Sequence, residues 1–370
     1  MGIQDNGDIS IGEHRRIQME KHIHGGNIYE HEGCLDFSAN CNPLGTPLSV
    51  QRAAVKSIEQ IAHYPQVGCV PLRAAIAEYE AVRPEQVICG NGAAELIFSL
   101  CQALKPRKAL LLAPTFAEYG QALSSVGCQI TCARLREEDG FAVGEEFLDL
   151  LQEDLDIVFL CNPNNPTGAL TDRSLLLRIL ERCETRGIFL AVDECFLDFV
   201  KTPSEYTLKG ELEKSRGLFL LKAFTKRYAM AGLRLGYGLC ENKELLEQMA
   251  AMVQPWNVSV PAQAAGLAAL QEEDYVRRAR ALIFREREWM VEQFTALGLT
   301  VYPPQANYIF FKGPEALFSL CEKRGVLIRD CGNYPGLCKG YFRVAVRTHE
   351  ENELLVKALT ESFMEIQKEG

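Results

Sequence analysis

The chain has 370 residues, and its 47% hydrophobic, 24% charged and 9% aromatic residues are close to the average of globular proteins. This composition excludes long disordered, collagen-like or fibrous stretches, and the length suits two domains. Lys and Arg number 39 against 49 Asp and Glu, so the net charge of −10 disfavours non-specific binding to nucleic acid or to an anionic membrane.

In chain order, amphipathic stretches alternate with short apolar runs, which is typical of a mainly parallel sheet covered by helices. A helix is predicted after Pro47, with an apolar stripe of Val50, Ala54, Ile58 and Ile61. Buried strands are predicted at 87–89, 108–113, 156–161, 188–193 and 217–222. Helices fill the intervals, so we expect an α/β fold.

The region after Gln254 has a different pattern. A long charged helix is predicted at 273–296, followed by strands at 308–313, 326–330 and 342–346 and by a closing helix. This order is typical of a smaller α+β domain. No repeat or low-complexity linker separates it from the preceding region, so the two domains should be in broad contact.

The fourteen cysteines are scattered between Cys34 and Cys338 without a Cys-x-x-Cys pair or zinc-finger spacing. We therefore expect reduced, mostly buried thiols and no metal site. The first residues, MGIQDNGDIS, lack the basic start and apolar block of a signal peptide, and no apolar run reaches the length of a membrane span. A cytoplasmic location is expected.

Ligands of open α/β sheets bind beyond the carboxyl ends of the strands, so the residues after each predicted strand are the candidate ligand contacts. The first junction, GNGAAE at 90–95, is a small-residue turn that opens a helix and could hold a phosphate or could simply be a tight turn. The second, NPNNPTG at 162–168, is a rigid loop. Neither has the glycine spacing of a dinucleotide site or a P-loop.

The remaining two junctions carry charge. Asp193 and Glu194 end an apolar run, and buried acids need a cationic partner, either a ligand or a nearby Arg or Lys. The segment KAFTKRY at 222–228 places lysines among small apolar residues, and a partly buried lysine can act as a nucleophile at neutral pH. A basic surface patch would also explain this cluster.

Together the four junctions resemble the pyridoxal phosphate enzymes of the aspartate aminotransferase fold, over roughly residues 22–365. The resemblance implies fold type I, with a mainly parallel seven-stranded sheet between helices and a smaller α+β domain. It implies an N-terminal arm at 1–47 that joins the small domain, a large cofactor-binding domain at 48–252 and a small domain at 253–370.

The same resemblance implies the cofactor site. Lys226 would form the Schiff base with pyridoxal 5'-phosphate, and Asp193 would pair with the pyridinium nitrogen. Asn165 would contact the ring hydroxyl, and Phe116 would stack on the ring. The residues implied at the cofactor phosphate are Gly92, Ala93, Ala94, Thr225, Arg234 and, from a neighbouring subunit, Tyr64. A homodimer with shared active sites is therefore expected.

Two positions depart from the pattern of the family. Ala223 replaces the usual Ser or Thr three residues before the lysine, so Thr225 would substitute as a phosphate ligand. Phe196 replaces the tyrosine that most aminotransferases place three residues after the aspartate. Loss of that phenol should make the lysine–cofactor linkage more basic.

Within the family, strings such as HGGN at 24–27, DFSANCNPLG at 36–45 and IRDCGNYPGL at 328–337 resemble the subgroup that acts on phosphorylated amino compounds. The resemblance implies decarboxylation of L-threonine O-3-phosphate for cobalamin biosynthesis, with Arg343 at the substrate carboxylate, His24 and Arg329 at its phosphate, and Asn165 as a further substrate contact. Arginine forks suit both anions. The alternative is transamination of histidinol phosphate or a related phosphorylated amine.

Other functions are less consistent with these residues. A cofactor-binding protein without catalysis would not need Lys226, Asp193 and Arg234 together. A nicotinamide dehydrogenase would need a glycine fingerprint after an early strand. The expected partners are a small phosphorylated amino acid and a second copy of the chain, without nucleic acid or membrane.

Overall fold

The computed structural model describes residues 24–369 of the chain. Residues 1–23 lie outside this part, and with them the segment MGIQDNGDIS and half of the predicted arm at 1–47. Within residues 24–369, no helix combines the length and the apolar character that crossing a membrane requires. The fourteen cysteines are free thiols and most of them are buried, as predicted.

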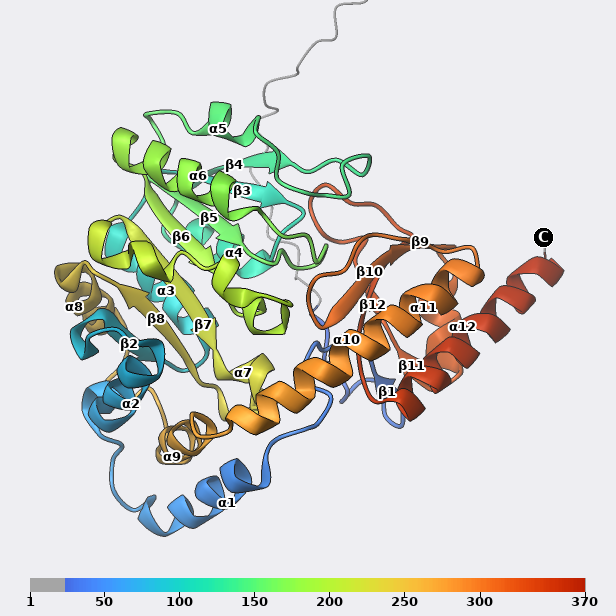
Figure 1. The fold of residues 1–370 in the computed structure, drawn as a ribbon, viewed down its shortest axis with the longest axis horizontal. Helices are drawn as coiled ribbons and strands as arrows, with labels where there is room; N and C mark the ends of the chain where they lie inside the picture. The colour runs from blue at the N-terminus through green and yellow to red at the C-terminus, as the bar shows by residue number, and fades with distance from the viewer. Residues whose placement is uncertain (1–23, 370) are drawn as a thin grey trace, which may run out of the picture.

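A seven-stranded sheet forms the centre of the larger part of the molecule (Figure 1). Its spatial order is β2 (Val87–Gly90), β8 (Gly236–Cys240), β7 (Leu218–Ala223), β6 (Phe189–Asp193), β5 (Ile157–Cys161), β3 (Lys108–Ala113) and β4 (Gln129–Arg134). β8 runs antiparallel to both of its neighbours, and the other neighbouring pairs are parallel. The predicted mainly parallel seven-stranded sheet is confirmed.

Helices cover both faces of this sheet because its strands are apolar on both faces. Leu110 and Leu112 of β3 pack into one core, whereas Ala109 and Leu111 pack into the other. The first core includes α2 (Val70–Glu80), α5 (Phe147–Leu150), α6 (Arg173–Arg186) and α9 (Val260–Ala269). The second includes α3 (Ala93–Leu104), α4 (Ala117–Ser125) and α8 (Lys243–Met252).

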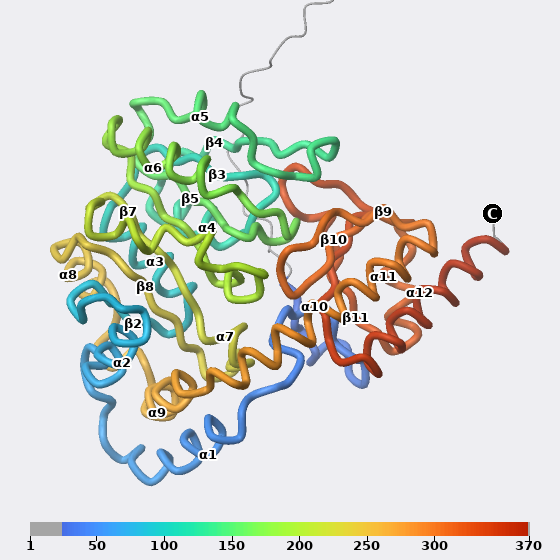
Figure 2. Tube along the Cα trace, viewed as in Figure 1, coloured from blue at the N-terminus to red at the C-terminus, as the bar shows by residue number. Residues whose placement is uncertain are grey.

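The smaller part contains a four-stranded antiparallel sheet in the order β12 (Arg329–Asp330), β13 (Tyr341–Ala345), β10 (Tyr308–Lys312) and β9 (Thr300–Val301). The helices α10 (Glu273–Ala296), α11 (Leu317–Lys323) and α12 (His349–Glu369) pack with it around a third core. α10 extends from the neighbourhood of α9 to this sheet (Figure 2). The third core also contains Phe37, which links the N-terminal segment to this part of the molecule.

The predicted strand at 326–330 is wrong as a single element. Its first half is β11 (Val326–Leu327), which pairs in parallel with β1 (Leu35–Asp36), and its second half is β12, which pairs with β13. Ile328 separates the two, because the chain changes pairing partner there. The change places the N-terminal arm beside β11, directly before the strand that carries Arg329.

The helix predicted after Pro47 is α1 (Leu48–Lys56), and it packs against α9. Val50 and Ala54 pack on the core, but α1 ends at Lys56, and Ile58 and Ile61 of the same predicted stripe lie in and after a 3-10 turn and are 51% and 59% exposed. Only the first half of the predicted stripe therefore faces the core of this chain. Because α9 lies beyond residue 252 and packs on α1, the division at 48–252 and 253–370 remains a proposal.

The short elements complete the fold. α7 (Phe224–Arg227) follows β7 directly. Turns of 3-10 helix lie at Ser57–Gln60, Val67–Cys69, Pro84–Gln86, Leu197–Phe199, Pro203–Glu205, Lys209–Lys214 and Ala231–Leu233.

Candidate active site

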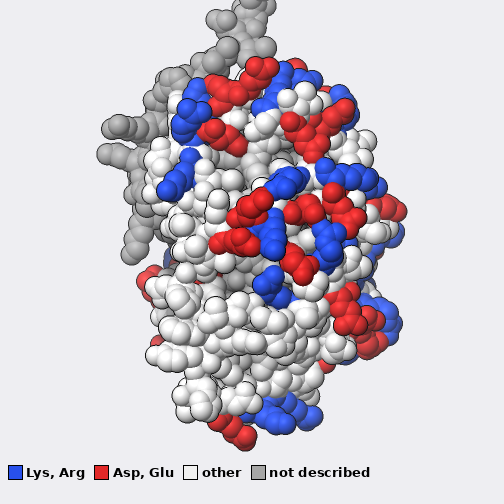
Figure 3. Space-filling model, turned by 90° about the vertical axis from the view of Figure 1, so that its left-hand side faces the viewer, with Lys and Arg blue, Asp and Glu red and all other residues white. Residues whose placement is uncertain are grey.

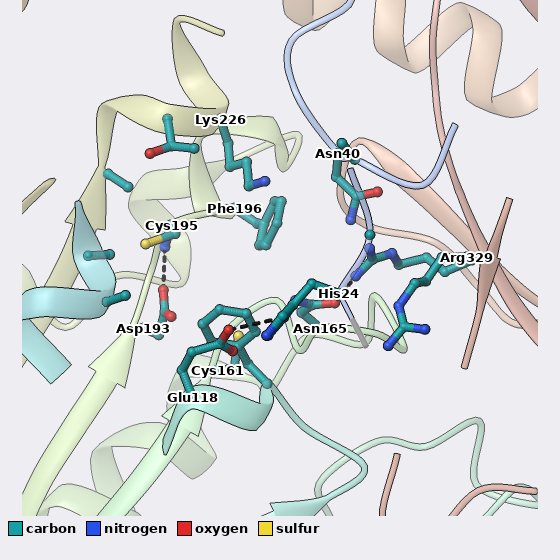
Figure 4. A pocket seen from close by; sticks show the side chains of 18 of the residues that line it. His24, Asn40, Glu118, Cys161, Asn165, Asp193, Cys195, Phe196, Lys226 and Arg329 are labelled. Carbon is teal, nitrogen blue, oxygen red and sulfur yellow. Dashed lines mark hydrogen bonds and ion pairs between the residues drawn. The ribbon is translucent and has the colours of Figure 1, made fainter. Parts of the chain in front are cut away.

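A cavity of about 230 Å³ lies at the carboxyl ends of β5, β6 and β7, where the sequence predicted a ligand site. Residues of the small sheet and of the N-terminal arm close its other side (Figure 4). Its lining includes His24, Ala93, Ala94, Phe116, Asn165, Asp193, Thr225, Lys226, Arg234, Arg329 and Arg343. Of the predicted site residues, only Gly92 and Tyr64 do not line it.

Asp193 is the last residue of β6 and is 6% exposed. Its Oδ2 accepts a hydrogen bond of 2.6 Å from the hydroxyl of Tyr119, and its Oδ1 accepts one of 2.9 Å from the amide of Cys195. Burial raises the pKa of this carboxyl, and the two hydrogen bonds oppose the rise. No Lys or Arg of residues 24–369 forms an ion pair with it, so the site suits a ligand that brings its own cation.

Glu194, the next residue, is buried on the opposite side of the strand and does have a protein cation. Lys222 Nζ lies 3.5 Å from Glu194 Oε2 and 3.3 Å from Glu80 Oε1. Burial opposes the charge of Lys222, but Glu80 and Glu194 raise its pKa above the ordinary value. Lys222, the first residue of the basic cluster predicted at 222–228, therefore pairs with buried acids of the protein itself.

Lys226 lies on the short helix α7, and its side chain points into the cavity (Figure 4). Its Nζ is 6.0 Å from the ring centroid of Phe196, which also lines the cavity. Phe196 packs edge-on against Tyr308 at 5.0 Å. A primary amine with this partly apolar surrounding can be attached covalently to an aldehyde.

A phosphate cradle opens at the N-terminus of α3. Gly92 caps this helix with φ of 80°, and a Cβ on it would lie 2.5 Å from Nη2 of Arg234. A Cβ on Gly236 would lie 2.5 Å from the amide nitrogen of Ala93. Two glycines thus allow the helix terminus, with its exposed amides, to approach a guanidinium closely, and this combination suits a phosphate.

Asn165 and Arg343 meet in the cavity. Arg343, 5% exposed, donates to the side-chain oxygen of Asn165 and, over 2.8 Å, to the carbonyl of Ser38. The neighbouring Asn164 holds the NPNNPTG loop itself, because its amide donates over 3.0 Å to the carbonyl of Pro114. Asn164 thus anchors the loop, whose next residue, Asn165, lines the cavity.

Arg329 and Arg343 are direct partners across the antiparallel pair of β12 and β13. Residues that face each other in this way project from the same face of a sheet, and both side chains line the cavity. Arg329 is also 5% exposed, and its guanidinium lies 5.3 Å from the ring centroid of Tyr334. Two buried cations side by side repel each other unless anions lie between or beside them.

Tyr64 lies outside the cavity of its own chain. It is 77% exposed and stacks on Trp256 with 4.3 Å between the ring centroids. The predicted contact with a cofactor of a neighbouring subunit remains a prediction.

The cavity also contains residues that the sequence interpretation missed. Glu118 from the first turn of α4 and Ser38 and Asn40 from the N-terminal arm line the cavity. Tyr119, also on α4, lies behind the lining and contacts Asp193. The string PTFAEY offered one signal, because a residue three positions after Phe116 lies on the same side of a helix. The hydrogen bond from Tyr119 to Asp193 depends on how α4 packs against β6, and no local sequence pattern shows that packing.

These features fit pyridoxal phosphate on three independent counts: a buried acid that no Lys or Arg of residues 24–369 pairs with, an amine in the cavity and an open cradle for phosphate. The cavity also has cationic donors besides those of the phosphate cradle at α3, because Arg329 and Arg343 line it from the small sheet. That wall can hold the anionic groups of a second molecule.

Comparisons with known proteins agree with this geometry. Residues 32–359 match the sequence profile of the class I and II aminotransferases. The chain is 39% identical to threonine-phosphate decarboxylase of Salmonella typhimurium over 348 residues, which is 91% of this chain and 95% of the relative.

Two further relatives differ in activity. An adenosylcobalamin biosynthesis bifunctional protein of Leptospira interrogans is 31% identical over 92% of this chain and 41% of its own length. The crystal structure of the histidinol-phosphate aminotransferase from Clostridium acetobutylicum superposes with a TM-score of 0.84 at 30% identity, covering 90% of this chain and 99% of that one.

Proposed function

Because the chain belongs to the class I and II aminotransferase family, we propose that it decarboxylates L-threonine O-3-phosphate to (R)-1-aminopropan-2-yl phosphate, with pyridoxal phosphate as cofactor. The relative of 39% identity supports this reaction, and the bifunctional relative supports a place in cobalamin biosynthesis. The fourteen free thiols agree with a reducing cytoplasm.

One observation carries the choice of substrate: the cross-strand pairing of Arg329 with Arg343. Two buried guanidiniums on one wall call for a ligand with two anionic groups, and threonine phosphate has a carboxylate and a phosphate. Arg343 and Asn165 bind the carboxylate, whereas Arg329 and His24 bind the phosphate. Histidinol phosphate has only one of these anions.

The cofactor is held by the residues that already fit it. Lys226 attaches it, Asp193 holds a proton at its ring nitrogen, and Phe116 packs on the ring. Asn165 also contacts the ring hydroxyl. The phosphate ligands are Gly92, Ala93, Ala94, Thr225, Arg234 and the Tyr64 of a second subunit.

Bound pyridoxal phosphate supplies an electron sink for the bond that breaks at the substrate Cα. The chain supplies orientation and protons. Arg343 fixes the carboxylate that leaves, and Asp193 keeps the ring nitrogen protonated. The Lys226 amine then delivers a proton to Cα, where the carboxylate was. Arg329 and His24 hold the phosphate of the substrate, so that rotation about Cα is restricted.

The proposed enzyme is a homodimer. Exposed apolar side chains gather on α1, at the start of α2 and near α9: Val55, Ile58, Ile61, Tyr64, Val67, Val70 and Trp256. At the level of these helices the surface in Figure 3 is broad and nearly free of charge. Exposed patches of this kind mark protein interfaces, and an interface here would cover Ile58 and Ile61.

Transamination of a phosphorylated amine is the second candidate, and the superposition with the Clostridium aminotransferase favours it. Purified holoenzyme incubated with threonine phosphate and no keto acid separates the two. Sustained release of carbon dioxide supports the decarboxylase. No carbon dioxide, together with glutamate formed from histidinol phosphate and 2-oxoglutarate, supports the aminotransferase instead.

A further inference from the structure

An open groove of about 440 Å³ lies between α2, α7 and α10 and shares no lining residue with the active-site cavity. We call it the α10 groove, because most of its lining comes from the first half of that helix, beside α7 (Figure 1). Its lining includes Tyr79, Arg227, Glu273, Arg277, Arg280 and Phe284. None of these residues has a part in the function proposed above.

The lining of the α10 groove carries more positive than negative charge. Arg227, Arg277 and Arg280 supply the cations, and Glu273 supplies an acid. Glu273 lies seven residues before Arg280, which is about 10 Å along the axis of a helix. The acid is thus at one end of the groove and Arg280 is near the other, so this part of the groove favours an anion.

Two of the three arginines are already paired with acids. Arg227 forms an ion pair with Asp198 and donates to the hydroxyl of Tyr79, and its guanidinium lies 5.1 Å from the ring centroid of that tyrosine. Arg277 forms an ion pair with Asp274. The charges of these two arginines are therefore compensated within the chain.

Arg280 is the exception. Its hydrogen bonds to residues 24–369 both run from Nη2, over 2.9 Å to the carbonyl of Val200 and over 2.7 Å to the carbonyl of Lys201. Its Nε has no partner in the same part of the chain, and the residue is half-buried. Two carbonyls thus fix the guanidinium without neutralising it. A fork held in this way is prepared for an anion that comes from outside the chain.

Arg277, Arg280 and Phe284 follow one another at spacings of three and four residues, so they form a row on one face of α10. The two neighbouring like charges repel each other unless an anion lies beside them. The guanidinium of Arg280 is 5.8 Å from the ring centroid of Phe284, and this ring packs against the third core. A ligand along the row therefore needs an anionic end and an apolar end.

We propose that the α10 groove binds a phosphate monoester with an aromatic group. Its phosphate lies at the guanidiniums of Arg277 and Arg280, because a dianion with three acceptor oxygens matches two arginine forks. Its aromatic group lies against Phe284. Arg227 of the same groove directly follows Lys226, so the ligand adjoins the helix that carries the lysine of the active-site cavity. The site does not depend on the proposed function.

The test is calorimetric titration of holoenzyme with phenyl phosphate, which counts the molecules bound per chain. We expect wild type to bind one in the α10 groove and one beside Arg329 in the active-site cavity. Arg280→Gln should weaken the groove site about tenfold or more, as loss of charge-assisted hydrogen bonds implies. Arg277→Gln should weaken it about threefold, because an exposed charge contributes less. Arg277 is 77% exposed, so this second variant keeps its fold even where Arg280→Gln does not.

Arg278→Gln is the matched control. Arg278 is the next residue of α10 and pairs with the same Asp274 as Arg277, with 3.0 Å between Nε and Oδ2, but it does not line the groove. We expect this variant to bind phenyl phosphate like the wild type. Arg329→Ala should lose the other bound molecule and keep the one in the groove, so the two sites are counted separately.

Two further ligands test the chemistry of the site. Inorganic phosphate lacks the ring, and benzoate has the ring with a carboxylate in place of the phosphate. Phenyl phosphate should bind in the groove more tightly than either. Phe284→Leu should reduce its advantage over inorganic phosphate, because the aromatic contact is lost.

Three results would overturn the inference: Arg280→Gln and Arg277→Gln that bind as much phenyl phosphate as wild type, an equal loss in Arg278→Gln, or benzoate that binds in the groove as tightly as phenyl phosphate. The proposed function is tested apart from this. If Arg329→Ala keeps both bound molecules, the phosphate site of the substrate is wrong, while the loss in Arg280→Gln still decides the α10 groove.

Discussion

The hydroxyl of Tyr119 donates a hydrogen bond of 2.6 Å to Oδ2 of Asp193, and the tyrosine is fully buried. Its ring stacks on Phe159 of β5 at 5.0 Å, so packing between α4 and the sheet fixes the donor. The acid that is proposed to hold the cofactor nitrogen is thus itself held by a residue from a different element. This second layer of contact orients the carboxylate before any ligand binds.

Tyr119→Phe should therefore weaken cofactor binding. Loss of the hydroxyl removes one of the two hydrogen bonds that oppose the burial-driven rise in the pKa of Asp193. A hydrogen bond to a charged group contributes about 1.5 kcal/mol or more, so we expect about tenfold weaker binding of pyridoxal phosphate to apoenzyme, measured by fluorescence titration. Tyr341→Phe, which removes a 2.6 Å hydrogen bond to Glu137 outside the cavity, should bind the cofactor normally.

Phe196→Tyr should change the titration of the bound cofactor. Phe196 lies where most aminotransferases place a phenol, and its ring is 6.0 Å from Lys226 Nζ. A tyrosine there would donate to the ring oxygen of the cofactor and lower the pH at which the absorbance of the holoenzyme changes. Phe284→Tyr on α10, outside the cavity, is the control. Identical titration curves for wild type and Phe196→Tyr would show that position 196 does not tune the linkage.

Ligands that carry only one of the two anionic groups should distinguish the roles of Arg329 and Arg343. Arg329→Ala should raise the KM for threonine phosphate about tenfold or more and remove inhibition by O-phosphoethanolamine, which has a phosphate but no carboxylate. Arg343→Ala should also raise the KM but keep that inhibition. Arg347→Ala is the control, because Arg347 contacts the carbonyl of Asp36 and Glu351 outside the cavity. If both alanine variants lose the inhibitor equally, the assignment of separate anions is wrong.

Glu80 should make the stability of the protein depend on acid pH. Burial alone would raise the pKa of Glu80, but Lys222, Lys209 and a hydrogen bond from Tyr237 lower it from its ordinary value to about 2. Its stabilisation is present above the unfolded pKa and is lost as the pH falls toward about 2. Glu80→Gln should therefore lower the free energy of unfolding by about 3 kcal/mol at neutral pH.

Urea unfolding at neutral pH and near pH 3 measures this effect, and the difference between Glu80→Gln and wild type should shrink at the lower pH. Glu213→Gln removes an exposed ion pair with Arg83 and should change the free energy by less than about 0.5 kcal/mol at either pH. A difference for Glu80→Gln that does not depend on pH would point to packing instead of charge.

The sequence predicts those features of the site that follow from one local rule. Parallel strands bring their carboxyl ends to one edge, so the junctions after 87–89, 156–161, 188–193 and 217–222 were expected to converge, and their residues line one cavity. The aspartate was recognised because an apolar run that ends in an acid is unusual. These inferences needed no knowledge of how helices pack.

Other features depend on which elements meet. Val326 and Arg329 are three residues apart, yet they belong to different sheets, and nothing local distinguishes their partners. The predicted stripe after Pro47 is correct for Val50 and Ala54 and wrong for Ile58 and Ile61, because the α-helix ends at Lys56 and the exposed isoleucines follow it. Glu118 escaped notice because an acid in the first turn of a helix is ordinary until its neighbours are known.

The pairing of β1 with β11 brings the beginning and the end of the chain together on one side of the cavity. The strand junctions and α3 furnish the wall proposed for the vitamin, while an arm from the beginning of the chain and β12 and β13 from its end furnish the other. Exchange of residues 24–47 together with 326–347 between relatives would thus transplant substrate preference and leave the reactive machinery in place.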